Sequence, residues 1–235
     1  MNLGGGRFRE VGQPAGIAKA GDNEGKGLGV VAFDYDRDGF TDVYVANDTT
    51  PNFLWRNNGD GTFTDVAQAA GVALGLNGES QAGMGVDAGD VNGDGFTDIH
   101  VTNFASELNA LYLGRRGGQF TEASRRVNLG ETYVPLGFGT LLVDVDLDGD
   151  QDIVTANGHI NEMVEVTDPG HGSTYRQRTD LFLNRGGGVF DKASDRGGPA
   201  FATPCVGRAL ARSDFDSDGD VDIALMTLDR SLVLL

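Results

Sequence analysis

Short apolar runs alternate with Gly- and Asp-rich turns along the whole 235-residue chain. After each of four Asp-rich stretches, the next residues are strand-like in their spacing and rich in β-branched side chains, as in 43–45, 99–101, 153–155 and 223–225. Gly-rich turns followed by an aromatic residue, as in 57–63, are typical of hairpins. The pattern therefore predicts an all-β protein with many turns.

The pattern repeats about every 59 residues, which is within the range of repeat arrays and propellers. In the first unit we expect a strand at 28–33 before the Asp-rich stretch and a second strand at 42–47 after it. A third strand at 52–55 and a fourth at 62–66 flank the Gly-rich turn. Four short antiparallel strands per unit predict the blades of a β-propeller.

The chain is interpreted as one propeller domain, residues 1–235, whose repeat units lie at about 28–66, 84–123, 138–193 and 207–235 plus 1–11. The last unit ends in its third strand, at 231–235, and the N-terminal strand at 7–11 would supply the fourth strand of that blade. Three blades are then complete and one is split between the termini. Either the ends pair and close a four-bladed ring, or the chain is an arc of a larger propeller, which the strand at 231–235 favours.

Two sets of residues indicate how the blades pack. A pair of small residues precedes each Asp-rich stretch, as expected where backbones crowd near a propeller axis: Gly27 and Gly29, Gly83 and Gly85, Gly137 and Gly139, Gly207 and Ala209. Large side chains on the later strands are interpreted as core between blades: Phe53, Trp55, Phe63, Tyr112, Phe120, Phe182 and Phe190.

The four Asp-rich stretches share the template D-x-[DN]-x-D-G-x-x-D and carry the candidate chemistry. Oxygen ligands at positions 1, 3, 5 and 9 of a tight loop can converge on a hard divalent cation, and the irregular geometry favours Ca²⁺ over Mg²⁺. Position 7 varies, as expected if it supplies only its carbonyl. The candidate ligands are Asp34, Asp36, Asp38, Phe40 and Asp42; Asp90, Asn92, Asp94, Phe96 and Asp98; Asp144, Asp146, Asp148, Asp150 and Asp152; Asp214, Asp216, Asp218, Asp220 and Asp222.

Up to four Ca²⁺ ions are therefore expected, with the second loop binding most weakly because Asn92 removes one ligand charge. The alternative is that these loops are solvated Asp/Gly turns without a metal, although four copies in one register weigh against it. The EF-hand is a second alternative. It requires a Glu at position 12 and flanking helices, whereas position 12 is Val45, Val101, Thr155 and Leu225, within strand-like runs.

Composition restricts the classes of partner. The formal net charge is −17, which four divalent ions would reduce to −9, and Lys and Arg form no track for phosphates. Nucleic acid and anionic membranes are therefore not expected as partners, and no apolar run is long enough for membrane insertion. Cys205 is the single cysteine, so the chain forms no internal disulfide.

The third repeat is longer than the others, and the extra residues fall in an insertion loop at 158–178. This loop carries His159, Glu162 and His171. Long insertions often bind ligands, but a surface loop packed by its own apolar residues explains the sequence equally well. No nucleophile elbow, zinc-protease motif or phosphate loop is found elsewhere.

The Asp loops, the strand 42–47 and the segment 52–66 resemble FG-GAP/VCBS repeats, the repeats of integrin α-subunit propellers. Within that family the chain resembles bacterial proteins similar to cartilage acidic protein, whose repeats precede an ASPIC/UnbV domain. The resemblance implies a seven-bladed, Ca²⁺-binding propeller that is exported to the periplasm, the cell surface or the medium. The chain departs from it in having four units and no ASPIC segment.

Together these observations predict a calcium-binding propeller segment that acts as a non-catalytic scaffold for protein or glycan contacts in adhesion, either as a monomer or within a longer chain. No catalytic residue and no organic cofactor are assigned. The alternatives are a carbohydrate-active lyase or hydrolase, or a glycan-binding module, using the insertion at 158–178.

Overall fold

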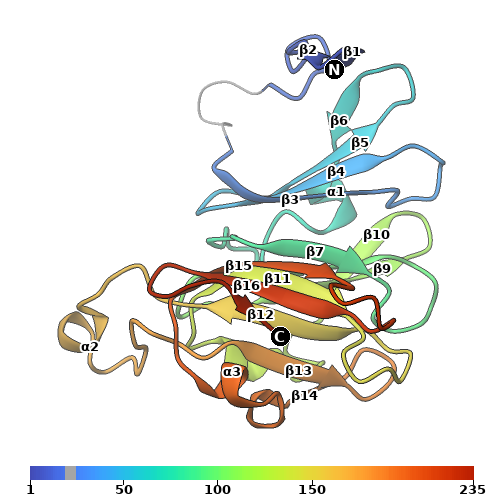
Figure 1. Cartoon of the computed structure of the whole chain (residues 1–235). Helices are drawn as coiled ribbons and strands as arrows, with labels where there is room; N and C mark the ends of the chain where they lie inside the picture. The colour runs from blue at the N-terminus through green and yellow to red at the C-terminus, as the bar shows by residue number, and fades with distance from the viewer. Residues whose placement is uncertain (19–24) are drawn as a thin grey trace.

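The computed structural model describes residues 1–18 and 25–235, which form four antiparallel sheets in chain order, the blades of a β-propeller (Figure 1). Blade one consists of β3 (Gly27–Phe33), β4 (Asp42–Asn47), β5 (Phe53–Asn57) and β6 (Phe63–Asp65). Blade two consists of β7 (Val86–Gly89), β8 (Asp98–Val101), β9 (Ala110–Arg115) and β10 (Gln119–Glu122). The predicted all-β propeller is confirmed.

Blades three and four differ in their number of strands. Blade three consists of β11 (Gly137–Val143), β12 (Asp152–Asn157), β13 (Asp180–Asn184) and β14 (Phe190–Lys192). Blade four consists of β15 (Gly207–Ser213), β16 (Asp222–Thr227) and β17 (Val233–Leu234). Short helical turns connect or follow the strands: α1 (Ala67–Ala70), η2 (Leu129–Thr132), α2 (Val164–Thr167), η3 (Ser194–Arg196) and α3 (Pro199–Ala202).

The innermost strands of successive blades lie against one another, β3 on β7, β7 on β11 and β11 on β15. Small residues are required at these contacts. A Cβ atom on Gly29 or Gly85 would collide with a backbone carbonyl of the next blade, that of Met84 or Phe138. The predicted crowding of backbones at the inner strands is therefore confirmed, and it brings the four Asp loops to equivalent places in the four blades.

The hydrophobic core lies between blades. One cluster joins blades one and two and includes Phe120, a second joins blades two and three and includes Phe182 and Phe190, and a third joins blades three and four. These aromatic residues thus pack as predicted. Phe53 and Trp55 instead pack on each other, with ring centroids 5.4 Å apart.

The predicted split blade is wrong for this structure. Residues at the N-terminus form a separate two-stranded sheet, in which β1 (Asn2–Gly4) pairs with β2 (Arg7–Phe8). Within the described residues, β17 pairs with β16. Gly4, Gly5 and Gly6 all adopt positive φ angles and turn the chain back on itself, so that β1 and β2 form a hairpin. Figure 1 shows this hairpin beside blade one, far from β17.

The insertion at 158–178 contains α2 and extends away from the sheets (Figure 1). Among the described residues, every helix is too short or too polar to cross a membrane.

Candidate metal centres

Each Asp loop connects the first and second strands of its blade and is closed by the carboxylate at position 1. In the first loop, Asp34 accepts N–H hydrogen bonds from Asp38 at 3.1 Å and Gly39 at 2.9 Å. The same two contacts recur at Asp90, Asp144 and Asp214, with distances between 2.7 and 3.2 Å. The repeated sequence therefore produces one repeated loop geometry.

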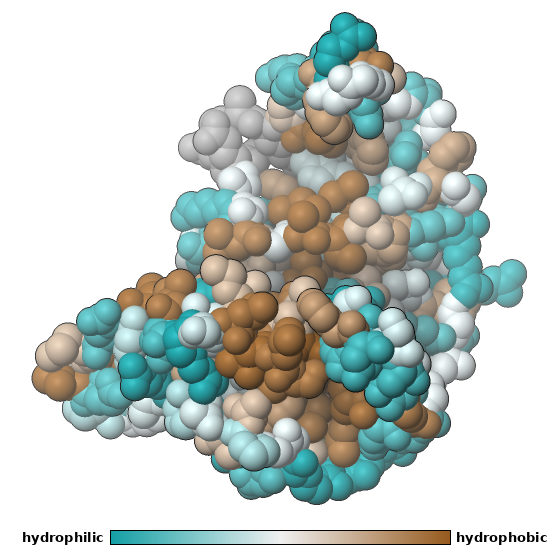
Figure 2. Space-filling view, in the orientation of Figure 1, coloured by the Kyte–Doolittle hydropathy of each residue, from teal (hydrophilic) through white to brown (hydrophobic). Residues whose placement is uncertain are grey.

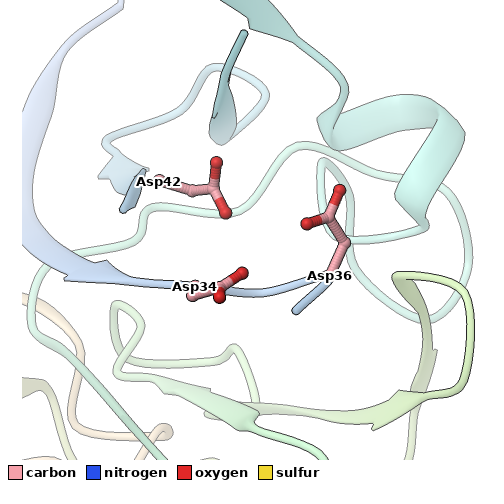
Figure 3. Close-up of side chains that lie close together, drawn as sticks. All are labelled: Asp34, Asp36 and Asp42. Atoms are coloured by element: carbon pink, nitrogen blue, oxygen red, sulfur yellow. The ribbon is translucent and has the colours of Figure 1, made fainter. Parts of the chain in front are cut away.

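Carboxylates converge in three of the loops. One oxygen from each of three residues lies within 4.8 Å of the others in Asp34, Asp36 and Asp42; in Asp144, Asp146 and Asp152; and in Asp214, Asp216 and Asp218. Figure 3 shows the first group, whose carboxylates surround a common space. A set of closely spaced oxygen donors is suited to a hard divalent cation such as Ca²⁺.

The second loop differs from the others. Among the described residues it forms no group of three convergent carboxylates, because Asn92 stands at position 3. The Asn92 amide donates to an Asp94 oxygen at 3.1 Å, and its own oxygen accepts the Asp94 N–H at 2.9 Å. This side chain is thus bound within the loop, and one charge is lost from the candidate site.

The carboxylate at position 9 lies deepest and has a second set of contacts. In blade three, buried Asp152 accepts N–H bonds from Val145 at 2.9 Å and from Asn184 on the third strand at 2.8 Å. Asp42 and Asp98 bind the third strand in the same way, through Asn57 and Gly114. Position 9 therefore links the loop to the rest of its blade.

Burial changes the electrostatics at position 9. It raises the pKa of Asp42 and Asp152, and it raises the pKa of Asp98 to about 7. Neighbouring carboxylates of each loop raise these pKa values further, while the backbone N–H bonds oppose the shift. A cation bound in the loop would favour the charged form of all these groups.

Two backbone positions in each loop adopt left-handed conformations. Position 6 is glycine, with φ between 84° and 100°, as predicted. Position 4 also has positive φ, and there Arg37, Leu147 and Ser217 are not glycine. Only Gly93, in the second loop, suits this conformation without strain. Sequence reasoning missed position 4, because its residues share no chemical feature.

Positions 5 and 7 of each loop are joined by a hydrogen bond. Asp38, Asp94, Asp148 and Asp218 each accept the N–H of position 7, which is Phe40, Phe96, Asp150 or Asp220, at 2.9–3.0 Å. Asp38, Asp148 and Asp222 lie outside the three convergent groups. The assignment of individual ligands stays a prediction.

Sequence reasoning also missed a buried polar corner between the second and third strands. The Asn52 side chain accepts the Asn47 N–H at 2.8 Å, and Asn109 accepts the Asn103 N–H at 3.0 Å in blade two. In blade three, the Asn157 amide donates to Asp180 at 2.8 Å. The available signal was an Asn at the end of the second strand in blades one and three, and two residues after it in blade two; these side chains hold the turn to the third strand.

The polar residues of the insertion do not form one site. His171 Nε2 lies 2.7 Å from Ser106 Oγ, whereas the His159 ring packs edge-on against Phe104. Glu162 accepts a weak hydrogen bond from the Tyr175 hydroxyl at 3.4 Å. Within the described residues, His159, Glu162 and His171 are not grouped around a metal-sized space.

A cavity of about 540 Å³ lies beside the insertion. Residues 172–174 and 176–178 line one wall, and Val134, Pro135 and Lys192 are on the others. The charged side chains there are already paired, because Lys192 Nζ lies 2.9 Å from Asp180 and Arg178 lies 2.7 Å from Asp195. The cavity therefore has no unpaired charge at Lys192 or Arg178 to attract an ion.

A family model described as an FG-GAP-like repeat matches residues 34–101 and 90–155. Cartilage acidic protein 1 of Mus musculus is 27% identical over 225 residues, which cover 93% of this chain and 31% of that protein. Cartilage acidic protein 1 of Xenopus tropicalis is 28% identical over 192 residues, which cover 79% of this chain and 26% of that protein. The chain thus spans less than a third of the length of these curated relatives.

Among solved structures, the exotype rhamnogalacturonan lyase YesX is similar, with a TM-score of 0.42 and 18% identity over 84% of this chain and 38% of that chain. Both curated relatives come from animals, so the bacterial affiliation expected from the sequence stays a prediction. The two family matches begin at Asp34 and Asp90, the first residues of two Asp loops, and together span more than half of the sequence. The chain therefore belongs to the FG-GAP-like repeat family.

Proposed function

We propose that this chain is a Ca²⁺-binding, non-catalytic propeller scaffold for contacts with proteins or glycans. The observation that supports this proposal is the convergence of three carboxylate oxygens within 4.8 Å in each of three equivalent loops. Three such carboxylates repel one another unless a cation lies between them. The loops have only oxygen donors, which favours Ca²⁺ over transition metals.

Calcium has a structural role in this proposal. Each loop joins two strands of a blade, and in blades one to three its position-9 carboxylate also binds the third strand, as Asp152 binds Asn184. An ion held by Asp144, Asp146 and Asp152 would therefore fix three strands of blade three at once. Binding to the folded state alone stabilises it by about 2.7 kcal/mol when free calcium is a hundredfold above the dissociation constant.

Thermal unfolding tests calcium binding. The melting temperature should rise with added CaCl₂, fall with chelator, and respond less to MgCl₂ at equal ionic strength. A triple variant, Asp34→Asn, Asp144→Asn and Asp214→Asn, should lose most of the calcium response. An unchanged melting temperature in both calcium and chelator would contradict the proposal.

Export is part of the proposal, because exposed loops of modest affinity fill where calcium is abundant. Extracellular modules bind calcium with dissociation constants of about 10⁻⁴–10⁻³ M. Isothermal titration gives the affinity directly. Dissociation constants below about 10⁻⁷ M in all loops would instead indicate a site that is filled inside cells.

The cavity beside the insertion favours a second candidate function, the binding of a neutral glycan. Its paired charges and its volume of about 540 Å³ suit a polar, uncharged ligand. Val134 lies on the wall and is 41% exposed, so Val134→Trp should fill the cavity without disturbing the core. Binding on a glycan panel that Val134→Trp abolishes would support this function, and product formation from a bound glycan would indicate an enzyme.

A further inference from the structure

Two cavities occupy equivalent places in blades two and three. In blade three, Gln177 Oε1 accepts the Leu136 N–H at 2.9 Å, and Gln177 lines the cavity of about 540 Å³ beside the insertion. In blade two, Glu107 Oε2 accepts the Ala82 N–H at 2.8 Å, and Glu107 lines a cavity of about 430 Å³. Ala82 and Leu136 each stand directly before a pair of small residues, so the two cavities repeat one feature of the blade.

A second correspondence lies after the Gly-rich turn. Two residues beyond the Phe of this turn, blade two has Glu122 and blade three has Lys192, and each side chain lines the cavity of its blade. Two residues further on, the hydroxyls of Ser124 and Ser194 each accept an N–H bond from the third strand. The two cavities are therefore built from the same backbone positions but carry different charges.

The fold itself does not require the negative charges of the cavity in blade two. Glu107 and Gln177 accept the same backbone N–H bond, so an uncharged amide oxygen is sufficient for this role. Lys192 shows that the place of Glu122 does not require a carboxylate. The charges of Glu107 and Glu122 are thus additional to what the packing of the blade needs.

The cavity in blade two lacks cations to balance these charges. Glu79, Glu107 and Glu122 line it together with Arg125, which gives the lining a formal charge of −2. Each glutamate accepts a backbone N–H bond of 2.8–3.0 Å, which holds its carboxylate in place. Among the described residues, none of the three forms an ion pair. Partly buried charges without a partner are unfavourable, so a cationic ligand suits this cavity.

The electrostatics of Glu107 agree with this. Burial raises the pKa of its carboxyl group, the N–H bond from Ala82 opposes the shift, and the carboxylates of Glu79 and Asp48 raise the pKa further. An ammonium group in the cavity would favour the charged form of Glu107.

The arrangement of the carboxylates favours an extended cation over a metal ion. Within the part of the chain that the structure describes, Glu79, Glu107 and Glu122 are not among the groups of three whose oxygens lie within 4.8 Å of one another. One metal ion therefore cannot contact all three. Leu76 and Tyr133, which are 50% and 48% exposed, also line the cavity and offer apolar surface between its polar groups.

We propose that the cavity in blade two binds a linear aliphatic diamine, whose two ammonium groups pair with the glutamates while its methylene chain lies against Leu76 and Tyr133. The two positive charges match the formal charge of the lining, and a cavity with apolar walls and a few polar groups is typical of small-molecule sites. Ammonium groups are carried by free polyamines and by lysine side chains. A free polyamine is proposed because one such molecule brings both charges into one cavity. Its binding does not depend on calcium.

Calorimetric titration with cadaverine tests the site, with CaCl₂ in excess so that the Asp loops do not compete for the ligand. We expect one cadaverine molecule to bind per chain. n-Pentylamine has the same chain with a single charge, and Nα-acetyl-lysine methylamide represents a lysine of a protein. Both should bind weaker by about tenfold or more, because each lacks one ammonium group. Absence of cadaverine binding would overturn the proposal, and so would equal binding of cadaverine and the lysine compound.

Variants of the lining provide the second measurement. Glu107→Gln should weaken cadaverine binding by about tenfold without lowering the melting temperature, because Gln177 already fills the equivalent structural role. Glu122→Lys gives the cavity the charge of its counterpart in blade three and should abolish binding.

Glu162→Gln is the matched control, because it removes the same charge outside the cavity. Glu162 is exposed on the insertion, which projects at the left of Figure 2 with a surface that mixes hydrophilic and hydrophobic residues. This variant should bind cadaverine as the wild type does. Equal weakening in Glu107→Gln and Glu162→Gln would overturn the proposal by showing general attraction to an acidic protein.

Discussion

His100 Nδ1 lies 2.9 Å from Thr140 Oγ1, which joins the second strand of blade two to the inner strand of blade three. His100 is fully buried, and burial lowers its pKa to about 3, so the ring is neutral. Among the described residues its Nε2 has no hydrogen-bond partner, and Thr140 also donates to the Val154 carbonyl at 3.2 Å. This pair is therefore one of several polar links between blades two and three, with those of Asp87 to Leu142 and Asn184 to Val91.

A double-mutant cycle measures the link. Thr140→Val and His100→Leu should each destabilise the chain by roughly 1–3 kcal/mol, because each leaves a buried polar group without its partner. The double variant should cost less than the sum, with a coupling of about 1 kcal/mol. Urea unfolding gives the three values, and additive losses would show that the contact contributes nothing.

Under the proposed function, Asp152 has a structural role in addition to metal binding, whereas Asp146 serves the metal alone. With chelator present, Asp152→Ala should lower the free energy of unfolding by roughly 2–4 kcal/mol, because two backbone N–H groups, of Val145 and Asn184, lose their acceptor. Asp146→Ala is the control, and its stability in chelator should match the wild type or exceed it. Equal losses in the two variants would contradict this division of roles.

The charge at position 3 should set the order of calcium affinities. Asn92→Asp gives the second loop the ligand set of the others, and Asp146→Asn gives the third loop that of the second. We expect one site to tighten by about tenfold in the first variant and one to weaken by about tenfold in the second, about 1.4 kcal/mol each. Calorimetric titration resolves the sites. A wild-type second loop that already binds most tightly would refute the ordering.

Gly149 should be required for its backbone conformation. Its φ is 97°, and an added Cβ atom would have nothing within 4 Å, so Gly149→Ala should cost about 1–2 kcal/mol through backbone strain alone. Gly130→Ala is the matched control, because Gly130 is equally open but lies in η2 without positive φ. That variant should be neutral or slightly stabilising, and similar losses at the two positions would exclude the explanation from φ.

His159 should make stability depend on pH. Burial lowers its pKa, and its Nδ1 accepts the Asn161 N–H at 3.0 Å, so the folded chain holds the neutral ring. His171 and Arg208 lower this pKa further, while Glu165 opposes them. The unfolded chain therefore binds the proton more readily. The stabilisation is complete above about pH 6.5 and declines as the pH falls.

Comparison with His159→Gln isolates this effect. The difference in free energy of unfolding between wild type and variant should shrink or reverse from pH 8 to pH 5, measured at constant calcium. Contributions from the Asp loops cancel in this difference because both proteins share them. A difference that stays constant over this range would show that His159 does not titrate with unfolding.

The regular part of the fold could be predicted because each blade repeats the same local rules. Strand 42–47 was placed to the residue, since Asp42 ends the loop and Asn47 begins the next turn. The glycines of the inner strands and the phenylalanines between blades were also identified from their spacing. These features depend on contacts that recur in every unit, so four copies reinforce one interpretation.

The irregular part could not be predicted, because it depends on contacts that the sequence does not mark. The Gly-rich turn at 2–8 is itself a hairpin signal, and β1 does pair with β2, but only the coordinates show that β2 does not also join β17. Position 4 of the Asp loops is Arg37, Gly93, Leu147 or Ser217, so no shared residue type reveals its left-handed backbone. The convergence of carboxylates needed coordinates, and metal occupancy needs a measurement.

The position of Phe190 in the cluster of blade two has a consequence for how the chain is made. The hydrophobic interior of blade two is completed by an aromatic ring from the repeat that follows it in the chain. During synthesis, the hydrophobic core of such a repeat therefore stays exposed to water until the next repeat has been synthesised and packs against it. Truncation after one repeat should thus reduce stability by more than the loss of the contacts within the removed residues, because it also exposes the hydrophobic interior of the preceding repeat.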